Sequence, residues 1–270
     1  MRVGLAGFGN AGQEVARRLV AGAIPGMTLS AVTARDLDKA RAHAARLAPA
    51  PLVVPLRELA EHADVIAECA TAEALPEIVR LGLAAGRTVL VVSAAGLLGL
   101  PDAEQLARTG GGRLRIANGA LPGLDALRGA REGTIRSVRL TSQLRPDSLA
   151  REDYVLGLGF DFVARPPAAP VRVFQGSARD AAAAFPRHFN VAVALSIAGI
   201  GFDRTEIEVW ANPEVAGAVH RVDVDADDIG LTMISRNRPS ANPRTSRIVA
   251  PASSPACAQW WRPWWPAADI

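Results

Sequence analysis

The chain has 270 residues, of which 49% are hydrophobic and 21% are charged, and its formal net charge at pH 7 is +3. This length is enough for one large domain or two modest ones, and the composition is typical of a folded, water-soluble protein. So small a net charge argues against a nucleic-acid partner, whereas it suits a small anionic ligand.

Cysteines and histidines are too few and too scattered to build a disulfide framework or a metal site. The two cysteines, Cys69 and Cys257, lie far apart in the sequence. The first apolar strand begins at Arg2, which leaves no space for a signal peptide before it. The longest apolar run, Thr88–Leu100, is too short to cross a membrane. We therefore expect a cytoplasmic protein without a metal or a membrane partner.

The first half of the chain alternates short apolar strands with amphipathic helices. We expect strands over Arg2–Ala6, Met27–Thr33, Val65–Cys69, Thr88–Ser93 and Arg113–Ala117. We expect helices over Gln13–Ala21, Asp36–Leu47, Leu56–His62, Ala74–Ala85 and Asp102–Thr109. Such alternation predicts an α/β fold with a Rossmann-type, doubly wound parallel sheet that carries helices on both faces.

A glycine motif follows the first expected strand and opens the first helix. Gly7-Phe8-Gly9-Asn10-Ala11-Gly12 fits the pattern G-x-G-x-x-G. The first glycine permits a tight turn, the second lets the backbone approach a pyrophosphate, and the third lets helix and strand pack closely. The phosphate then accepts from unpaired N–H groups at the helix N-terminus. We predict that Gly7, Gly9, Asn10, Ala11 and Gly12 bind a dinucleotide; the alternative is a glycine-rich turn that binds nothing.

The end of the second expected strand bears on which dinucleotide is bound. An acidic side chain there binds the adenosine ribose of NAD and repels the 2′-phosphate of NADP. The sequence instead reads Thr33-Ala34-Arg35-Asp36, and the guanidinium of Arg35 suits a phosphate. Asp36 comes a little late and is positioned to cap the following helix. We predict that Arg35 contacts the cofactor and that NADP is accepted, alongside NAD; the alternative for Arg35 is a solvated surface residue.

After Asn118 the pattern becomes that of a second, α+β domain with a mixed or antiparallel sheet. We expect strands over Thr134–Leu144, Val171–Phe174, Thr205–Ala211 and Ala218–Asp225, the last two antiparallel, and helices over Ser177–Ala184 and Asn190–Ala198. We therefore divide the chain into a dinucleotide-binding domain, 1–118, and a domain for substrate binding, catalysis and dimerisation, 119–241. Segment 242–270 is expected to return to the first domain.

The C-terminal tail from Ala250 holds four of the five tryptophans and four prolines, without a helical or strand period. Exposed, such a segment would be adhesive. Two interpretations stay open: a plug at a dimer interface, or an altered or misread terminus.

Several motifs of the second half occur together with the glycine motif. They are Asn118-Gly119-Ala120, Phe185–Ala192 (FPRHFNVA), Ala198–Gly201 (AGIG), Val219–Val222 (VHRV) and Asn237–Ser246 (NRPSANPRTS). In this order they resemble the L-aspartate dehydrogenase family, and the resemblance runs from the first residue to about Ser246. The proline-rich tail departs from the family, in which a closing helix is expected there.

The resemblance implies reversible oxidative deamination of L-aspartate to oxaloacetate and ammonia through iminoaspartate, which in the family also feeds NAD biosynthesis. It places the catalytic histidine at His220 and cofactor contacts at Ala120 and Asn190. His188 departs from the family, which usually has an amide near that position. The resemblance also implies a homodimer.

The residues themselves agree in kind with this chemistry. Hydrolysis of an imine and release of ammonia move protons near neutral pH, which suits a histidine such as His220; a core or surface histidine is the alternative. A dicarboxylate needs cationic or N–H-rich partners, because a buried unpaired carboxylate is costly. The candidates are Asn242, Arg244, Thr245 and Ser246, although Asn242 is also suited to cap the following segment.

Two other functions stay open on the sequence alone. One is a related two-domain NAD(P) oxidoreductase that acts on another amino acid or small polar substrate. The other is a sensor or scaffold that binds the dinucleotide without turning it over.

Overall fold

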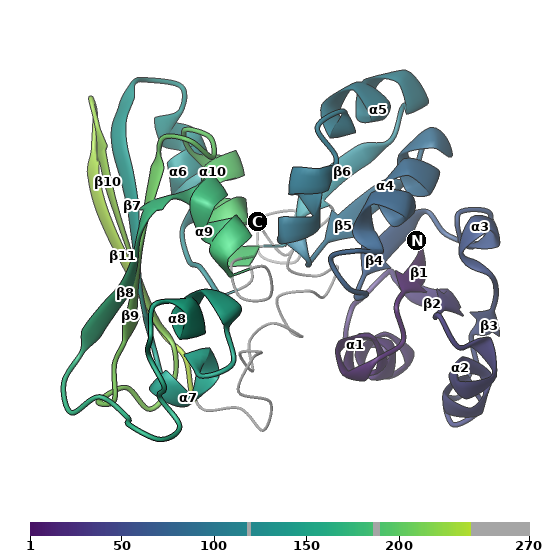
Figure 1. The fold of residues 1–270 in the computed structure, drawn as a ribbon. Helices are drawn as coiled ribbons and strands as arrows, with labels where there is room; N and C mark the ends of the chain where they lie inside the picture. The colour runs from purple at the N-terminus through teal and green to yellow at the C-terminus, as the bar shows by residue number, and fades with distance from the viewer. Residues whose placement is uncertain (118–119, 186–189, 239–270) are drawn as a thin grey trace, which may run out of the picture. The chain divides into compact units, whose positions relative to one another are not determined.

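The computed structural model describes residues 1–117, 120–185 and 190–238. It contains two compact units, one over Met1–Ala117 and the other within Asn118–Val249 (Figure 1). The return of segment 242–270 to the first unit, and the form of the tail, lie outside the described residues. No described helix is both long and apolar enough to span a bilayer.

The first unit contains a six-stranded sheet in which every neighbouring pair is parallel. The strands are β1 (Arg2–Ala6), β2 (Thr28–Thr33), β3 (Leu52–Val53), β4 (Val65–Glu68), β5 (Thr88–Val91) and β6 (Arg113–Ile116). Their order in the sheet is β3-β2-β1-β4-β5-β6, so the direction of winding reverses between β1 and β4. This arrangement confirms the doubly wound parallel sheet. It also marks the carboxyl edge near β1 and β4 as the place where such sheets bind ligands.

Helices of the first unit connect these strands. They are α1 (Asn10–Val20), α2 (Leu37–Ala44), α3 (Leu56–Leu59), α4 (Leu75–Ala84), α5 (Ala103–Gly110) and the 3₁₀ helix η1 (Ala94–Gly99). Helix α1 begins three residues earlier than predicted, directly in the glycine motif. Strands β1 and β4 are buried almost throughout, as expected for central strands with helices on both faces.

The second unit contains a five-stranded mixed sheet of order β11-β10-β7-β9-β8. Its strands are β7 (Ile135–Leu144), β8 (Val171–Ser177), β9 (Thr205–Ala211), β10 (Val219–Ala226) and β11 (Gly230–Arg236). Strand β9 runs parallel to β7 and antiparallel to β8, which confirms a mixed sheet; β9 itself, expected to be antiparallel, is so only toward β8. Strand β11, which pairs with β10 at the edge of the sheet, was not predicted.

The helices of the second unit are α6 (Leu124–Ala130), α7 (Pro146–Leu149), α8 (Asp153–Gly157), α9 (Ala178–Ala184) and α10 (Asn190–Ala198). Only α9 and α10 were predicted. Helix α9 begins with a capping box, in which Ser177 Oγ accepts from Asp180 N at 3.1 Å. Helix α10 is apolar almost all round and is buried against the sheet.

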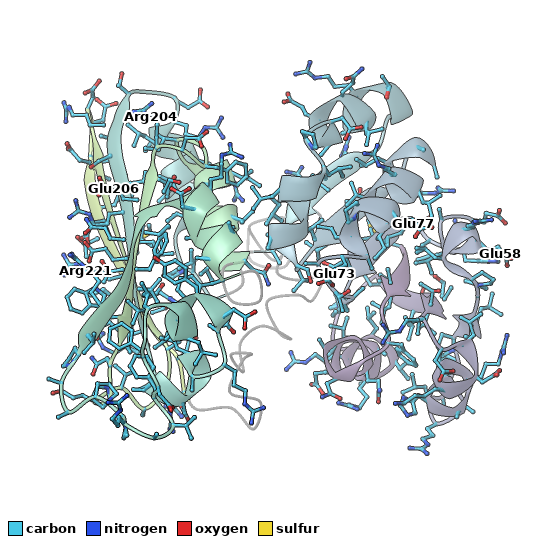
Figure 2. The ribbon with its side chains drawn as sticks, viewed as in Figure 1. Glu58, Glu73, Glu77, Arg204, Glu206 and Arg221 are labelled. Carbon is cyan, nitrogen blue, oxygen red and sulfur yellow. The ribbon has the colours of Figure 1, made fainter. Side chains whose placement is uncertain are left out.

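The two faces of this second sheet differ in what covers them. Helices α6, α9 and α10 lie on one face (Figure 1). The other carries charged side chains such as Glu206 and Arg221, which point away from the helices in Figure 2. Arg139 and Glu206 form an ion pair at 2.8 Å on this outer face. The inner face therefore holds the core, and polar side chains on it are exceptions that need a reason.

Candidate active site

The glycine motif forms a tight turn at the carboxyl end of β1. Gly7 has a φ of +104°, and a Cβ atom placed on it would lie 2.5 Å from the backbone C and O of Cys69. A Cβ on Gly12 would lie 2.2 Å from Gly7 O. A side chain at Gly7 would push the turn away from the end of β4, and a side chain at Gly12 would push α1 away from the turn. Close packing therefore requires glycine at both positions.

Gly9, unlike Gly7 and Gly12, faces open space. It precedes the first residue of α1, and a Cβ on it would meet no atom of the described residues within 4 Å. The first turn of α1, which includes Asn10 and Ala11, contains no acidic side chain. The helix N-terminus thus offers N–H groups and free space beside a glycine, and these residues fit the pyrophosphate of a dinucleotide.

The end of β2 lies beside this turn, since Gly7 N donates to Thr33 O at 2.9 Å. Arg35 follows two residues later and is exposed. Asp36 caps α2, where its Oδ1 accepts from Lys39 N at 2.9 Å. The carboxylate after β2 is therefore engaged in a helix cap, and the nearby guanidinium is accessible.

Glu68, at the end of β4, is fully buried and was not expected to have a role. Its Oε1 accepts from Ala70 N at 2.8 Å, and its Oε2 accepts from Val92 N at 2.9 Å and Ser93 N at 2.7 Å. Burial raises the pKa of this carboxyl, and the N–H donors oppose that shift. An acidic residue at the end of an otherwise apolar strand is the sequence signal that could have revealed it.

His220 lies on the inner face of β10 in the second unit and is 7% exposed. Its Nδ1 is 3.0 Å from Ser142 Oγ, on the neighbouring strand β7. Burial lowers the pKa of His220 from its usual 6.5 to about 4. The imidazole is therefore neutral at pH 7, with one ring nitrogen paired to a hydroxyl.

A row of polar side chains crosses the sheet at this histidine. His220 is in register with Ser142 on β7 and with Ser235 on β11. Among the described residues, Ser235 Oγ is buried without a hydrogen-bond partner. Neither serine was predicted, because cross-strand register depends on pairing between distant segments. The His220 ring can accept a proton, and the Ser235 hydroxyl has no partner among the described residues. Both lie on a largely apolar face, where they are suited to bind a polar ligand.

The remaining predicted site residues fall in several places. Asn190 is the first residue of α10, and Ala120 is buried at the start of the second unit. Asn118, Gly119, His188 and the proposed substrate residues lie outside the described residues; the latter are Asn242, Arg244, Thr245 and Ser246. Within the described part of the chain, no cluster of His, Cys, Asp or Glu is suited to hold a metal ion.

The first unit thus has the fold and the glycine turn of the nicotinamide-dependent dehydrogenases. Residues 7–116 match the family model described as "Homoserine dehydrogenase, NAD binding domain", and residues 125–258 match "Aspartate dehydrogenase, C-terminal". The chain is 42% identical over 250 residues to an L-aspartate dehydrogenase of Bradyrhizobium diazoefficiens, covering 93% of this chain and 88% of that one. It is also 42% identical to L-aspartate dehydrogenase 3 of Bordetella bronchiseptica, covering 92% and 90%. The chain belongs to the aspartate dehydrogenase family, as its motifs predict.

Solved structures agree on the fold. The aspartate dehydrogenase of Thermotoga maritima superposes with a TM-score of 0.65 at 20% identity, covering 87% of this chain and 88% of that one. The scyllo-inositol dehydrogenase of Lactobacillus casei superposes with a TM-score of 0.53 at 12% identity, covering 96% and 87%. These structures show the fold; the family models and the relatives at 42% identity show that the chain is a dehydrogenase with a nicotinamide dinucleotide as its cofactor.

Proposed function

We propose that this enzyme catalyses the NAD(P)-dependent oxidative deamination of L-aspartate to oxaloacetate and ammonia. The relatives named L-aspartate dehydrogenase support the substrate. The observation that carries the chemistry is His220, a buried neutral imidazole paired with Ser142 at 3.0 Å in the unit that matches the aspartate dehydrogenase model.

His220 is suited to move protons during hydrolysis of the imine. A nicotinamide dinucleotide held by the glycine turn would supply the acceptor for the hydride of the amine-bearing carbon, and loss of that hydride would leave iminoaspartate. Water must then add to the imine carbon while a base accepts its proton, and ammonia must leave with a proton. In the tautomer whose Nδ1–H donates to Ser142 Oγ, the other ring nitrogen has the lone pair that accepts and returns this proton. The carboxylates of a substrate bound beside the ring would favour the imidazolium and thus raise the low pKa of His220.

The carboxylates of L-aspartate require a cationic partner. We propose Arg244 for this role, with Asn242, Thr245 and Ser246 as further donors. For the cofactor we propose contacts from the glycine turn, from Ala120 and from Asn190. The same iminoaspartate would supply NAD biosynthesis if a second enzyme used it before it was hydrolysed.

We propose that NADP is used alongside NAD. Support comes from the end of β2, where Asp36 is engaged in capping α2 and Arg35 is exposed. Replacing Arg35 by Ala should raise KM for NADP about tenfold and change KM for NAD less than twofold, because only NADP carries the 2′-phosphate. Equal changes for both cofactors, or no turnover of NADP by the unaltered enzyme, would contradict this preference.

The decisive test is reduction of NAD and NADP by the purified protein, followed at the absorbance of the reduced nicotinamide, with L-aspartate and a panel of other amino acids and sugars. We expect L-aspartate to give the highest kcat/KM. His220→Ala should lower kcat by a factor of at least about 100, with cofactor affinity unchanged. His62→Ala, a histidine of the first unit, is the matched control. A faster substrate would point to a related oxidoreductase, and tight cofactor binding without turnover would point to a sensor.

We also propose that the enzyme is a homodimer and that the outer face of the five-stranded sheet forms its interface. Sheet faces of this kind, with helices on one side only, offer a large and regular surface for pairing across a two-fold axis. Besides its ion pairs, the face carries Ile234, which is 40% exposed.

A further inference from the structure

The buried carboxylate of Glu68 joins two turns at the carboxyl edge of the first sheet. Its Oε1 accepts from Ala70 N in the turn after β4, and its Oε2 accepts from Val92 N and Ser93 N in the turn after β5. Ser93 Oγ donates to Ala70 O at 3.2 Å and closes the connection from the other side. Four hydrogen bonds therefore fix the shape of these turns, and three of them depend on one side chain.

The glycine turn rests against the first of these turns but has its own backbone bonds. A Cβ on Gly7 would lie within 2.6 Å of Ala70 N, so the two turns are in direct contact. Gly7 N donates to Thr33 O at 2.9 Å, and Cys69 N donates to Ala6 O at 2.7 Å. Neither bond involves Glu68, so the glycine turn keeps its shape without that carboxylate.

The turns held by Glu68 lie on the side of the sheet expected to receive the nicotinamide. In a doubly wound sheet the pyrophosphate binds between the first strand and its helix, and the adenosine extends toward the second strand. The other half of the dinucleotide extends across the point where the winding reverses, here from β1 toward β4 and β5.

We propose that Glu68 is a positioning residue for the nicotinamide half of the cofactor. Its carboxylate holds the turns after β4 and β5 in the shape that receives this half, whereas the adenosine and pyrophosphate depend on the glycine turn. The proposal rests on the family's nicotinamide cofactor and is independent of L-aspartate as the substrate.

The test compares two ligands on the Glu68→Gln variant. The amide has one oxygen, so either Ala70 N or the N–H groups of Val92 and Ser93 must face an NH₂ group. Titration calorimetry with NADH and with ADP should show an NADH affinity at least about tenfold lower and an ADP affinity within twofold of the unaltered protein. Equal weakening of both ligands would show a general structural role, and unchanged NADH affinity would show none; either result overturns the proposal.

Two further variants keep the test decisive. Glu104→Gln changes an exposed carboxylate on α5 and should leave both affinities unchanged. If Glu68→Gln does not fold, Ser93→Ala decides, because it removes the hydroxyl that bonds to Ala70 O and to the Glu68 carboxyl but keeps the three N–H donors to that carboxyl. We expect NADH to bind about threefold more weakly to this variant and ADP to bind as before; no change for NADH, or an equal change for both ligands, overturns the proposal. Because binding is measured without aspartate, failure of the proposed reaction would leave these results interpretable.

Discussion

His220 makes the stability of the second unit depend on pH in a defined direction. Burial lowers its pKa in the folded protein from 6.5 to about 4, so the unfolded chain binds a proton more readily between these values. The contribution to stability is therefore complete above about pH 6.5 and is lost as the pH falls toward 4. A difference of this size corresponds to about 3 kcal/mol.

Urea unfolding at pH 7.5 and pH 4.5, with and without His220→Gln, would measure this effect. The variant should lose less free energy of unfolding on acidification than the unaltered protein, by roughly 2 kcal/mol, because glutamine does not titrate. Parallel pH dependences for the two proteins would contradict burial of a neutral imidazole.

Two glycines of the same motif should respond differently to alanine. On Gly12 the new methyl group would lie 2.2 Å from Gly7 O, so Gly12→Ala should lower the free energy of unfolding by about 2 kcal/mol or more. On Gly9 it would meet no atom within 4 Å, so Gly9→Ala should leave the melting temperature nearly unchanged. Because it fills the space expected for the pyrophosphate, Gly9→Ala should still weaken NADH binding at least about tenfold. Thermal melts and NADH titrations of both variants separate the two effects.

Among the helices whose N-terminal caps the structure describes, α9 has a complete capping box. Ser177 Oγ accepts from Asp180 N at 3.1 Å, and Asp180 Oδ2 accepts from the Ser177 hydroxyl at 2.6 Å. Ser177→Ala should lower the free energy of unfolding by about 1 kcal/mol in urea titrations, because it leaves first-turn N–H groups without this partner. The exposed Ser137→Ala serves as the control, and an equal loss in both variants would remove the capping explanation.

Elements with a long, regular pattern were the ones predictable from the sequence. Five of the six strands of the first sheet and helices α9 and α10 were predicted, whereas β3, with two residues, was not. Helices α7 and α8 have four and five residues, which is too short for a helical period to show. The parallel direction of β9 was missed because strand direction is decided by pairing with distant segments rather than by local pattern.

The candidate site was predictable only where its chemistry is contiguous in the sequence. The glycine motif is recognisable from six consecutive residues, and Asp36 directly precedes the helix that it caps. Glu68 and Ser142 were missed because their partners are distant: Ser93 is 25 positions from Glu68, and His220 is 78 positions from Ser142. The sequence shows an acid at the end of an apolar strand, but the donors that hold it are known only from the fold.

At the scale of the whole molecule, the proposed homodimer can be tested by mass. Light scattering should give twice 28.3 kDa for the unaltered chain. Ile234→Lys should lower the mass toward that of one chain, because it places a charge at an exposed apolar position of the proposed interface. Leu52→Lys changes an exposed apolar residue of the first unit and should leave the mass unchanged. A monomeric unaltered protein would exclude the interface.

The central position of β7 also has a consequence for how the chain folds during synthesis. Strand β7 lies between β9 and β10, yet β9 begins roughly 60 residues after β7 ends. At about 5–20 residues per second, the ribosome needs roughly 3 to 12 s to deliver that partner. All six strands of the first unit leave the ribosome before β7, so the first sheet can pair before β7 emerges. During this interval both edges of β7 are unpaired. We therefore expect the nascent chain to be most prone to aggregation and to chaperone binding in this interval.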